Sequence, residues 1–445
     1  MTQQTVPDAV IARDKPNFFE SAAPRSRSAP AQSAILRLIN AHEERRRITL
    51  NLVASENLMS AAARLALSSD FAHRYLIPPA GERPKEIWDY PNQSASREIE
   101  QIGKAIAKKL FHGAYADLRA LSGNNIAGIL LSSLVDKGET VLTVPGGAGG
   151  HFATSALCTK LGLKRRDLPY DNHTGRIDVE RCARLAQKIK PRFIYLDASM
   201  ILFPYPVSKL RDIFGQDCII AYDASHCFGL IAGGVFQSPL QEGADLIVGS
   251  THKSMFGPQK GLIVARENGA VAEKLHNAIT PLFVSNAHVH HVAALTIALE
   301  ELMYFGQDYA PRVVDNARAL AHCLTQRGAN ILFKDQNFTN CHQIVCKLEH
   351  IEALAALERL EHCGIHVNGI NVPFFGGPGL RLGAAELTRR AFDEDAMREV
   401  GHCLADALFT TAPAAEIAAR VCALSRAHPG IAFAFEALET RGASA

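Results

Sequence analysis

The sequence predicts an α/β fold, with a large domain on a mostly parallel sheet and a smaller C-terminal α+β domain. The chain has 445 residues, and domains usually run roughly 100 to 200 residues, so two domains are expected. Its composition, 47% hydrophobic and 21% charged, is typical of globular chains and excludes disordered, collagen-like and coiled-coil classes. From about Leu110, short runs that are apolar on both faces alternate with helical patterns, as in a buried parallel sheet covered by helices.

Residues 1–33 are expected to form a flexible N-terminal arm, because this stretch is rich in Ala, Pro and Ser. It lacks the apolar run of a secretory signal. The large domain is assigned to residues 34–310 and begins with a helical pattern at Ala34. Its buried strands are predicted by apolar runs at residues 139–144, 192–197, 218–223, 245–250 and 261–265.

The boundary between the two domains is placed at Pro311, which can sit in a connection or open a new helix after the helical pattern of residues 292–303. The smaller domain then covers residues 311–445. Its predicted elements are helices at residues 313–327 and 351–363, a strand at residues 343–348 and a Gly/Pro loop at residues 374–379.

Charge and cysteine content exclude several classes of partner. Lys and Arg number 47 against 45 Asp and Glu, so the formal charge of +2 gives no electrostatic footprint for nucleic acid. The 10 cysteines form no Cys-x-x-Cys pair, which disfavours zinc-ribbon and thioredoxin-like sites and favours reduced thiols.

The histidines at 288, 290 and 291 are interpreted as a helix start, and no metal is expected. No apolar run approaches the ~18 residues of a membrane span, so a cytoplasmic protein without membrane partners is expected.

Lys253 and Asp223 are the first candidate catalytic residues. Lys253 follows the predicted strand 245–250, and ligands of α/β proteins bind at the carboxyl ends of such strands. A lysine after a strand is by itself more often a surface cation. Asp223 ends the strand 218–223, where a buried carboxylate needs a cation or a hydrogen-bond donor. Pyridoxal phosphate would satisfy both residues, since it needs a lysine for its Schiff base and a carboxylate for its ring nitrogen.

Two further segments can complete such a site. Ser122, Gly123 and Asn124 precede an apolar helix, and a helix N-terminus offers unpaired N–H groups to a phosphate. The commoner use of a serine at this place is as a helix cap. The glycine-rich stretch before His151 matches neither a dinucleotide-binding nor a P-loop motif. The glycines of this stretch would let the backbone pass close to a flat ligand, on which the His151 ring would stack. The alternative interpretation is a solvent-facing turn that happens to contain a histidine.

Six ordered motifs resemble those of serine hydroxymethyltransferases, which are fold-type I, aspartate aminotransferase-like pyridoxal phosphate enzymes. The motifs are Ser55-Glu-Asn, Ser122-Gly-Asn, Gly149-Gly-His, Asp223-Ala-Ser-His, Thr251-His-Lys and Gly379-Leu-Arg-Leu-Gly. The resemblance implies that residues 34–310 bind the cofactor, with Lys253 as its Schiff-base lysine, Asp223 as the partner of the ring nitrogen and His151 stacked on the ring. It also implies that His226 contacts the 3-oxygen of the cofactor. Further cofactor contacts are implied for Ser122, Gly123, Asn124, Ser199 and His252.

The same resemblance implies a substrate site. Arg381 would bind the α-carboxylate of an amino acid, a task suited to a planar bidentate cation, with Ser55 beside it. The candidate proton carriers are Glu56, His151 and Tyr75, with Glu82 and Glu86 as weaker candidates, and the sequence does not choose among them.

The chain departs from the hydroxymethyltransferase pattern where that family handles folate. Ile77 occupies the position of a family glutamate, Gln259 replaces a family arginine, and the segment after Tyr75 is longer. These features, with Gly257-Pro-Gln-Lys-Gly, Phe305-Gly-x-Asp-Tyr-Ala and Leu387-Thr-Arg-Arg, resemble the L-threonine transaldolases of natural-product pathways.

The expected activity is therefore that of an L-threonine transaldolase. Such an enzyme cleaves L-threonine to acetaldehyde and a glycyl quinonoid that adds to an acceptor aldehyde, giving a β-hydroxy-α-amino acid. The alternatives are a serine or α-methylserine hydroxymethyltransferase, a simple threonine aldolase, and a catalytically silent relative. The resemblance also implies a homodimer. The acceptor aldehyde is not identified, and the segment of residues 76–91 is expected to select it.

Overall fold

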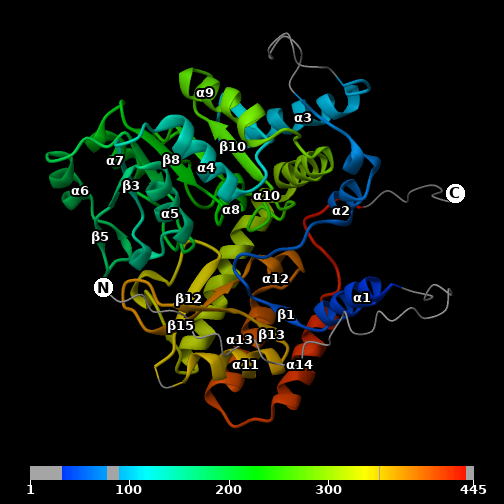
Figure 1. Cartoon of the computed structure of the whole chain (residues 1–445). Helices are drawn as coiled ribbons and strands as arrows, with labels where there is room; N and C mark the ends of the chain where they lie inside the picture. The colour runs from blue at the N-terminus through cyan, green and yellow to red at the C-terminus, as the bar shows by residue number, and fades with distance from the viewer. Residues whose placement is uncertain (1–32, 78–89, 350, 437–445) are drawn as a thin grey trace, which may run out of the picture. The chain divides into compact units, whose positions relative to one another are not determined.

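The computed structural model describes residues 33–77, 90–349 and 351–436 (Figure 1). Almost all of the expected N-terminal arm, and Glu82 and Glu86 of the inserted segment, lie outside the described residues. The chain divides into two compact units, Met1–Arg46 and Arg47–Ala445. Helix α1 (Ala34–Arg47), where the first helical pattern was predicted, has no buried residue.

The centre of the second unit is a sheet of seven strands in the order β2-β10-β9-β8-β7-β3-β4. Strands β9 through β4 pair in parallel, whereas β10 is antiparallel to both of its neighbours. The mostly parallel α/β sheet and its five predicted strands are therefore confirmed. The strands are β2 (Tyr115–Asp117), β3 (Thr140–Thr143), β4 (Lys164–Asp167), β7 (Phe193–Leu196), β8 (Ile219–Asp223), β9 (Leu246–Ser250) and β10 (Gly261–Ala265).

Helices cover both faces of this sheet, because alternate side chains of its strands point to opposite sides. Phe193 and Ile219 pack in one apolar cluster, while Ile194 and Ile220 pack in another. The first cluster contains α4 (Gly123–Leu134), α5 (Phe152–Leu161) and α9 (Ala270–Ala278). The second contains α3 (Ser94–Phe111), α6 (Val179–Ala186), α7 (Val207–Phe214), α8 (Phe228–Ala232) and α10 (Val289–Gln326). Short elements complete the unit: α2 (Ala61–Leu67), β5 (Tyr170–Asp171), β6 (Arg176–Ile177), three 3-10 turns (Asp70–His73, Gly146–Ala148, Lys334–Gln336) and a π-helical turn (Ile279–Phe283).

Helix α10 has 38 residues and passes through Pro311 without a break (Figure 1). The expected connection or new helix start at Pro311 is therefore wrong. Proline removes a helical N–H and usually breaks a helix, but Tyr309, Ala310 and Val313 around it are fully buried. Tertiary packing on both sides of the proline thus holds the helix together. The division of the chain between residues 310 and 311 stays a prediction.

The C-terminal part of the chain is a second α+β layer, as predicted. Its antiparallel sheet has the order β11-β12-β15-β14 and packs with its helices in a separate apolar cluster. The short strand β1 (Leu50–Asn51) joins this layer by pairing in parallel with β13 (Ile365–His366). The other elements are β11 (Asn330–Ile331), β12 (Gln343–Lys347), β14 (Asn368–Asn371), β15 (Pro378–Gly383), α11 (Ala353–His362), α12 (Ala385–Arg389), α13 (Glu394–Phe409) and α14 (Ala414–Ala427).

The described helices and the cysteines bear on two expectations from the sequence. In the ranges that the structure describes, no helix combines the length and the apolar character needed to cross a bilayer. All ten cysteines lie in those ranges as free thiols, and nine of them are buried.

A buried ion pair holds the loop after β9 against α10 and α12. The side chains of Arg389 and Glu301 are both 0% exposed, and Arg389 Nη2 lies 2.6 Å from Glu301 Oε2. The same guanidinium lies 3.7 Å from the ring centroid of Phe256, three residues after Lys253. The pair therefore supports the backbone that carries Lys253.

We expect Glu301→Ala to lower the free energy of unfolding by about 3–5 kcal/mol, because it leaves the Arg389 charge buried without its partner. The matched control is Glu300→Ala at the neighbouring, less buried position of the same helix. Urea denaturation followed by circular dichroism would measure both. Equal destabilisation by the two substitutions would show that the ion pair contributes nothing beyond helix packing.

Candidate active site

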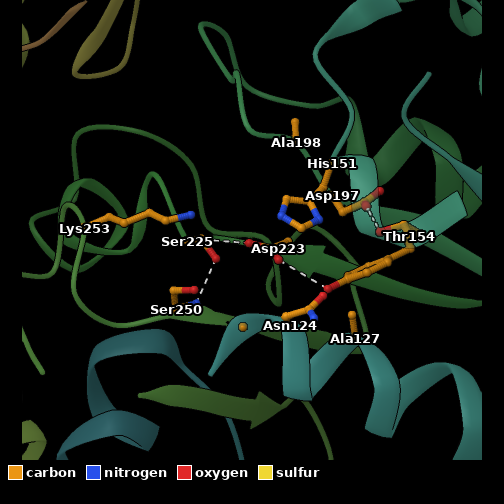
Figure 2. A pocket seen from close by; sticks show the side chains of 12 residues that line it. Asn124, Ala127, His151, Thr154, Asp197, Ala198, Asp223, Ser225, Ser250 and Lys253 are labelled. Atoms are coloured by element: carbon orange, nitrogen blue, oxygen red, sulfur yellow. Dashed lines mark hydrogen bonds between the residues drawn. The ribbon is translucent and has the colours of Figure 1, made fainter. Parts of the chain in front are cut away.

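The candidate site lies where the parallel strands of the large sheet end. Asp223 is the last residue of β8, and Lys253 follows β9 by three residues. Leu196 pairs with Tyr222, so Asp197 leaves β7 beside Asp223. The N-terminus of α4 faces this edge and closes a cavity between them (Figure 2). The cavity is lined by Gly123, Asn124, Ala127, His151, Thr154, Tyr195, Asp197, Ala198, Asp223, Ser225, Ser250 and Lys253.

Part of the residue set predicted from the sequence lines this cavity. It comprises Gly123, Asn124, His151, Asp223 and Lys253. The Ser122 hydroxyl accepts a hydrogen bond from the Asn125 N–H at 3.0 Å, so the interpretation of Ser122 as a helix cap is confirmed.

The Asp223 carboxylate is oriented by two donors. Its Oδ1 accepts a hydrogen bond from the Ser225 backbone N–H at 2.8 Å, and its Oδ2 accepts one from the Tyr195 hydroxyl at 3.2 Å. Burial, together with the Asp223 charge, raises the pKa of Tyr195 well above its usual value, so this hydroxyl keeps its proton. The carboxylate is thus held in one orientation at the floor of the cavity.

Lys253 and His151 meet in this cavity, where burial acts on both groups. Burial lowers the pKa of Lys253, although the Asp223 carboxylate acts in the opposite direction. Burial likewise lowers the pKa of His151. Figure 2 shows the Lys253 amine and the His151 imidazole pointing into the same space beside Asp223. The site therefore presents to one ligand an amine and an imidazole whose pKa values are both lowered by burial, together with a fixed carboxylate.

His226 and His252 flank Lys253 without lining the cavity. The His226 Nε2 lies 3.3 Å from Lys253 Nζ, and burial lowers the pKa of His226 well below its usual value. The Nδ1 atom of His252 is buried and has no partner among the described residues. Burial lowers the pKa of His252 to about 4, so both rings are neutral.

Arg381, on β15 of the second sheet, reaches back to the segment after β7. Its Nη1 donates to the Ser199 carbonyl at 2.6 Å, and its Nη2 donates to Asn368 Oδ1 at 3.0 Å. Its Nε is buried and has no partner among the described residues. Ser199 thus enters the site through its backbone carbonyl, and the guanidinium keeps a free donor.

The other predicted substrate and proton-transfer residues do not line this cavity. Ser55 and Glu56 lie in a loop that is tied to the site through Asn57, whose Nδ2 donates to the Lys253 carbonyl at 2.8 Å. Tyr75 is exposed and stacks on Tyr90 with ring centroids 4.9 Å apart. The roles assigned to Ser55, Glu56 and Tyr75 stay predictions.

Asp197 and its partner Thr154 also line the cavity, and neither residue was predicted from the sequence. Thr154 donates a hydrogen bond to Asp197 Oδ2, whereas Asp197 Oδ1 is buried without a partner among the described residues. Burial, reinforced by Asp223, raises the pKa of Asp197 well above its usual value, although the Thr154 hydrogen bond opposes the rise. Burial thus favours the protonated form of Asp197. Asp197 ends the predicted strand 192–197 as Asp223 ends the strand 218–223, so the rule that selected Asp223 could have found it.

Metal binding finds no support in this geometry. Within residues 33–77, 90–349 and 351–436, no three or more His, Cys, Asp or Glu side chains are arranged to hold a metal ion. The histidines at 288, 290 and 291 lie at the start of α10, as expected.

The cavity has the features that pyridoxal phosphate requires. The cofactor needs a lysine amine for its aldehyde, an acid for its ring nitrogen and an anion site for its phosphate. Lys253 and Asp223 meet the first two needs, and the N-terminus of α4 meets the third. At that terminus a Cβ on Gly123 would lie 2.4 Å from Ser250 Oγ and 3.2 Å from Ser250 N, so glycine lets the start of α4 approach the strand end closely. The residues of the cavity thus fit the cofactor.

A model of the family described as serine hydroxymethyltransferase matches residues 29–404. The chain belongs to the serine hydroxymethyltransferase family. It is therefore a fold-type I, pyridoxal phosphate-dependent enzyme of the transferase and aldolase class, and pyridoxal phosphate is its cofactor. The cofactor inferred from Lys253 and Asp223 in the sequence is confirmed.

Serine hydroxymethyltransferases from archaea are among the similar proteins. The enzyme from Methanosphaera stadtmanae is 37% identical over 380 residues, which cover 82% of this chain and 87% of that one. The enzyme from Pyrococcus furiosus is 35% identical over 382 residues, covering 83% of this chain and 88% of that one. A similar solved structure is that of L-threonine transaldolase from Pseudomonas fluorescens in its internal aldimine state. Its TM-score is 0.86 at 29% identity, over 90% of this chain and 93% of that one.

We expect Lys253→Met to abolish covalent attachment of the cofactor, because methionine has a similar length and no amine. The control is Lys260→Met at the other buried lysine near β10, whose Nζ donates to the Ala287 carbonyl at 2.8 Å outside the cavity. Intact mass after borohydride reduction should show the cofactor adduct on the wild type and on Lys260→Met. An adduct that persists on Lys253→Met would assign the attachment to another lysine.

Proposed function

We propose that this member of the serine hydroxymethyltransferase family is an L-threonine transaldolase. The main support is its similarity to the solved L-threonine transaldolase over 90% of the chain. The sequence adds Ile77 and Gln259 at positions where the folate-using enzymes have a glutamate and an arginine. The sequence relatives named serine hydroxymethyltransferase favour serine as the alternative substrate.

Bound pyridoxal phosphate supplies an electron sink for the pair released when a bond to the α-carbon of an amino acid breaks. Asp223 would hold the proton on the ring nitrogen, and the donors on both of its oxygens keep it an acceptor there. The N-terminus of α4 at Gly123 and Asn124 would hold the phosphate. His151 would cover the ring as a neutral imidazole.

Arg381 would bind the α-carboxylate of L-threonine and so orient its Cα–Cβ bond. The guanidinium is held by the Ser199 carbonyl and by Asn368, so its direction is fixed before substrate arrives. Cleavage of the Cα–Cβ bond releases acetaldehyde when the β-hydroxyl loses its proton. The new bond then forms between the same α-carbon and the acceptor aldehyde, whose oxygen takes up a proton.

His151 is the favoured carrier of these two protons. Among the candidates Glu56, His151 and Tyr75, it is the residue that lines the cavity, and its lowered pKa leaves a ring nitrogen free to accept a proton. Tyr75 is exposed in the single chain. Its candidacy therefore depends on the homodimer that we also propose, in which a second chain could cover it.

The test of this proposal is a pair of assays on the holoenzyme. We expect L-threonine with a panel of aldehydes to yield acetaldehyde and a coupled β-hydroxy-α-amino acid, both measured by mass spectrometry. Cleavage of L-serine that depends strictly on tetrahydrofolate would overturn the assignment in favour of a hydroxymethyltransferase. Glycine accumulating from L-threonine despite an acceptor would instead identify a simple threonine aldolase.

We expect Arg381→Lys to raise KM for L-threonine about 10- to 100-fold, since hydrogen bonds to charged groups contribute roughly 1.5–3 kcal/mol. Lysine keeps the charge but loses the planar pair of donors. Steady-state kinetics with the exposed Arg166→Lys as the control would measure the change. An unchanged KM would remove Arg381 from the substrate site.

A further inference from the structure

A fully buried amide contacts the imidazole next to Lys253. Gln343, the first residue of β12, is 0% exposed, and its Nε2 lies 2.9 Å from His226 Nδ1. The other ring nitrogen of the same imidazole, Nε2, lies 3.3 Å from Lys253 Nζ. A chain of contacts therefore runs from the second sheet through one histidine to the amine that binds the cofactor.

Two backbone groups fix the orientation of the Gln343 amide. The Ile201 N–H donates to Gln343 Oε1 at 3.0 Å, and Gln343 Nε2 donates to the Ser199 carbonyl at 3.1 Å. A flipped amide would turn its NH₂ group toward the Ile201 N–H and its oxygen toward the Ser199 carbonyl, which would lose both bonds. The atom that faces His226 Nδ1 is therefore the amide nitrogen, which can only donate.

A donor at Nδ1 determines where the neutral imidazole carries its proton. Nδ1 must accept from Gln343, so the proton lies on Nε2. His342 Nε2 lies 3.4 Å from the same Nδ1, and a proton there adds a second donor. Burial lowers the pKa of His226 well below its usual value, which disfavours a doubly protonated ring near neutral pH.

We propose that Gln343 is a positioning residue that holds the proton of His226 on Nε2, so that His226 donates to Lys253 Nζ and keeps Lys253 an unprotonated amine. Capture of pyridoxal phosphate joins Nζ to the aldehyde carbon, and the carbonyl oxygen leaves with the two amine hydrogens as water. An ammonium has no lone pair with which to form this bond. The inference rests on the proposed role of Lys253.

The charged and titratable groups around His226 and Lys253 are consistent with this arrangement. They are Asp223, Cys227, His252, Cys341, His342 and Arg381. Arg381 disfavours the charged forms of both His226 and Lys253, whereas Asp223 favours the charged form of Lys253. A hydrogen bond donated by His226 Nε2 to Lys253 Nζ favours the unprotonated amine and so opposes Asp223, which raises the pKa of Lys253.

The experiment measures the pH at which the apoenzyme captures pyridoxal phosphate at half its maximal rate, followed by visible absorbance. Gln343→Glu should raise this midpoint by about one pH unit, because an anion that accepts from Nδ1 moves the proton off Nε2 and favours an ammonium at Lys253. Gln343→Met, of similar length but without polar atoms, should raise it less. Gln326→Glu, the same change at an exposed position of α10, should leave it unchanged.

Two outcomes would overturn the proposal. One is a midpoint in Gln343→Glu equal to that of the wild type, and the other is an equal shift in Gln343→Glu and Gln343→Met, which would indicate lost packing. If Gln343→Glu does not fold, ¹⁵N NMR of the wild type decides. The imidazole whose signals vanish in His226→Asn must carry its proton on Nε2, and a proton on Nδ1 refutes the inference. Because no amino acid substrate is used, failure here is independent of the transaldolase assays.

Discussion

An amine buried beside a single carboxylate is the constraint on which the rest of this site depends. In its proposed role Lys253 must lose its proton to react; burial favours that loss, whereas Asp223 opposes it. The Tyr195 hydroxyl and the Ser225 N–H each donate a hydrogen bond to one oxygen of the Asp223 carboxylate. It also surrounds the amine with rings that carry no charge. The reactivity of Lys253 is thus a balance of desolvation against one fixed anion.

The strand ends of the large sheet made much of this site predictable. Parallel strands finish at one edge, so Asp223 and Lys253 had to meet there once their strands were recognised. Asp197 obeys the same rule and was overlooked. Gln343, by contrast, reaches His226 from a position 117 residues later in the chain, and no local pattern encodes such a contact. The unbroken path of α10 through Pro311 was likewise decided by tertiary packing that overrides a local preference.

One backbone carbonyl connects Arg381 with Gln343, the residue that contacts His226 beside Lys253. Ser199 O accepts from Arg381 Nη1 and from Gln343 Nε2. These two side chains stand on β15 and β12, which are neighbouring strands of the second sheet. The segment after β7 is therefore clamped by the C-terminal layer at the point where it borders the cavity. On the proposed roles of Arg381 and Gln343, a displacement of that layer would weaken substrate carboxylate binding and the hold on the His226 proton together.

The unbroken α10 has a mechanical consequence. At 1.5 Å per residue, its 38 residues make a rod roughly 57 Å long that contributes to the apolar clusters of both layers. Because one continuous helix carries residues of both clusters, a substitution that breaks α10 near its proline would disturb the packing of both layers at once.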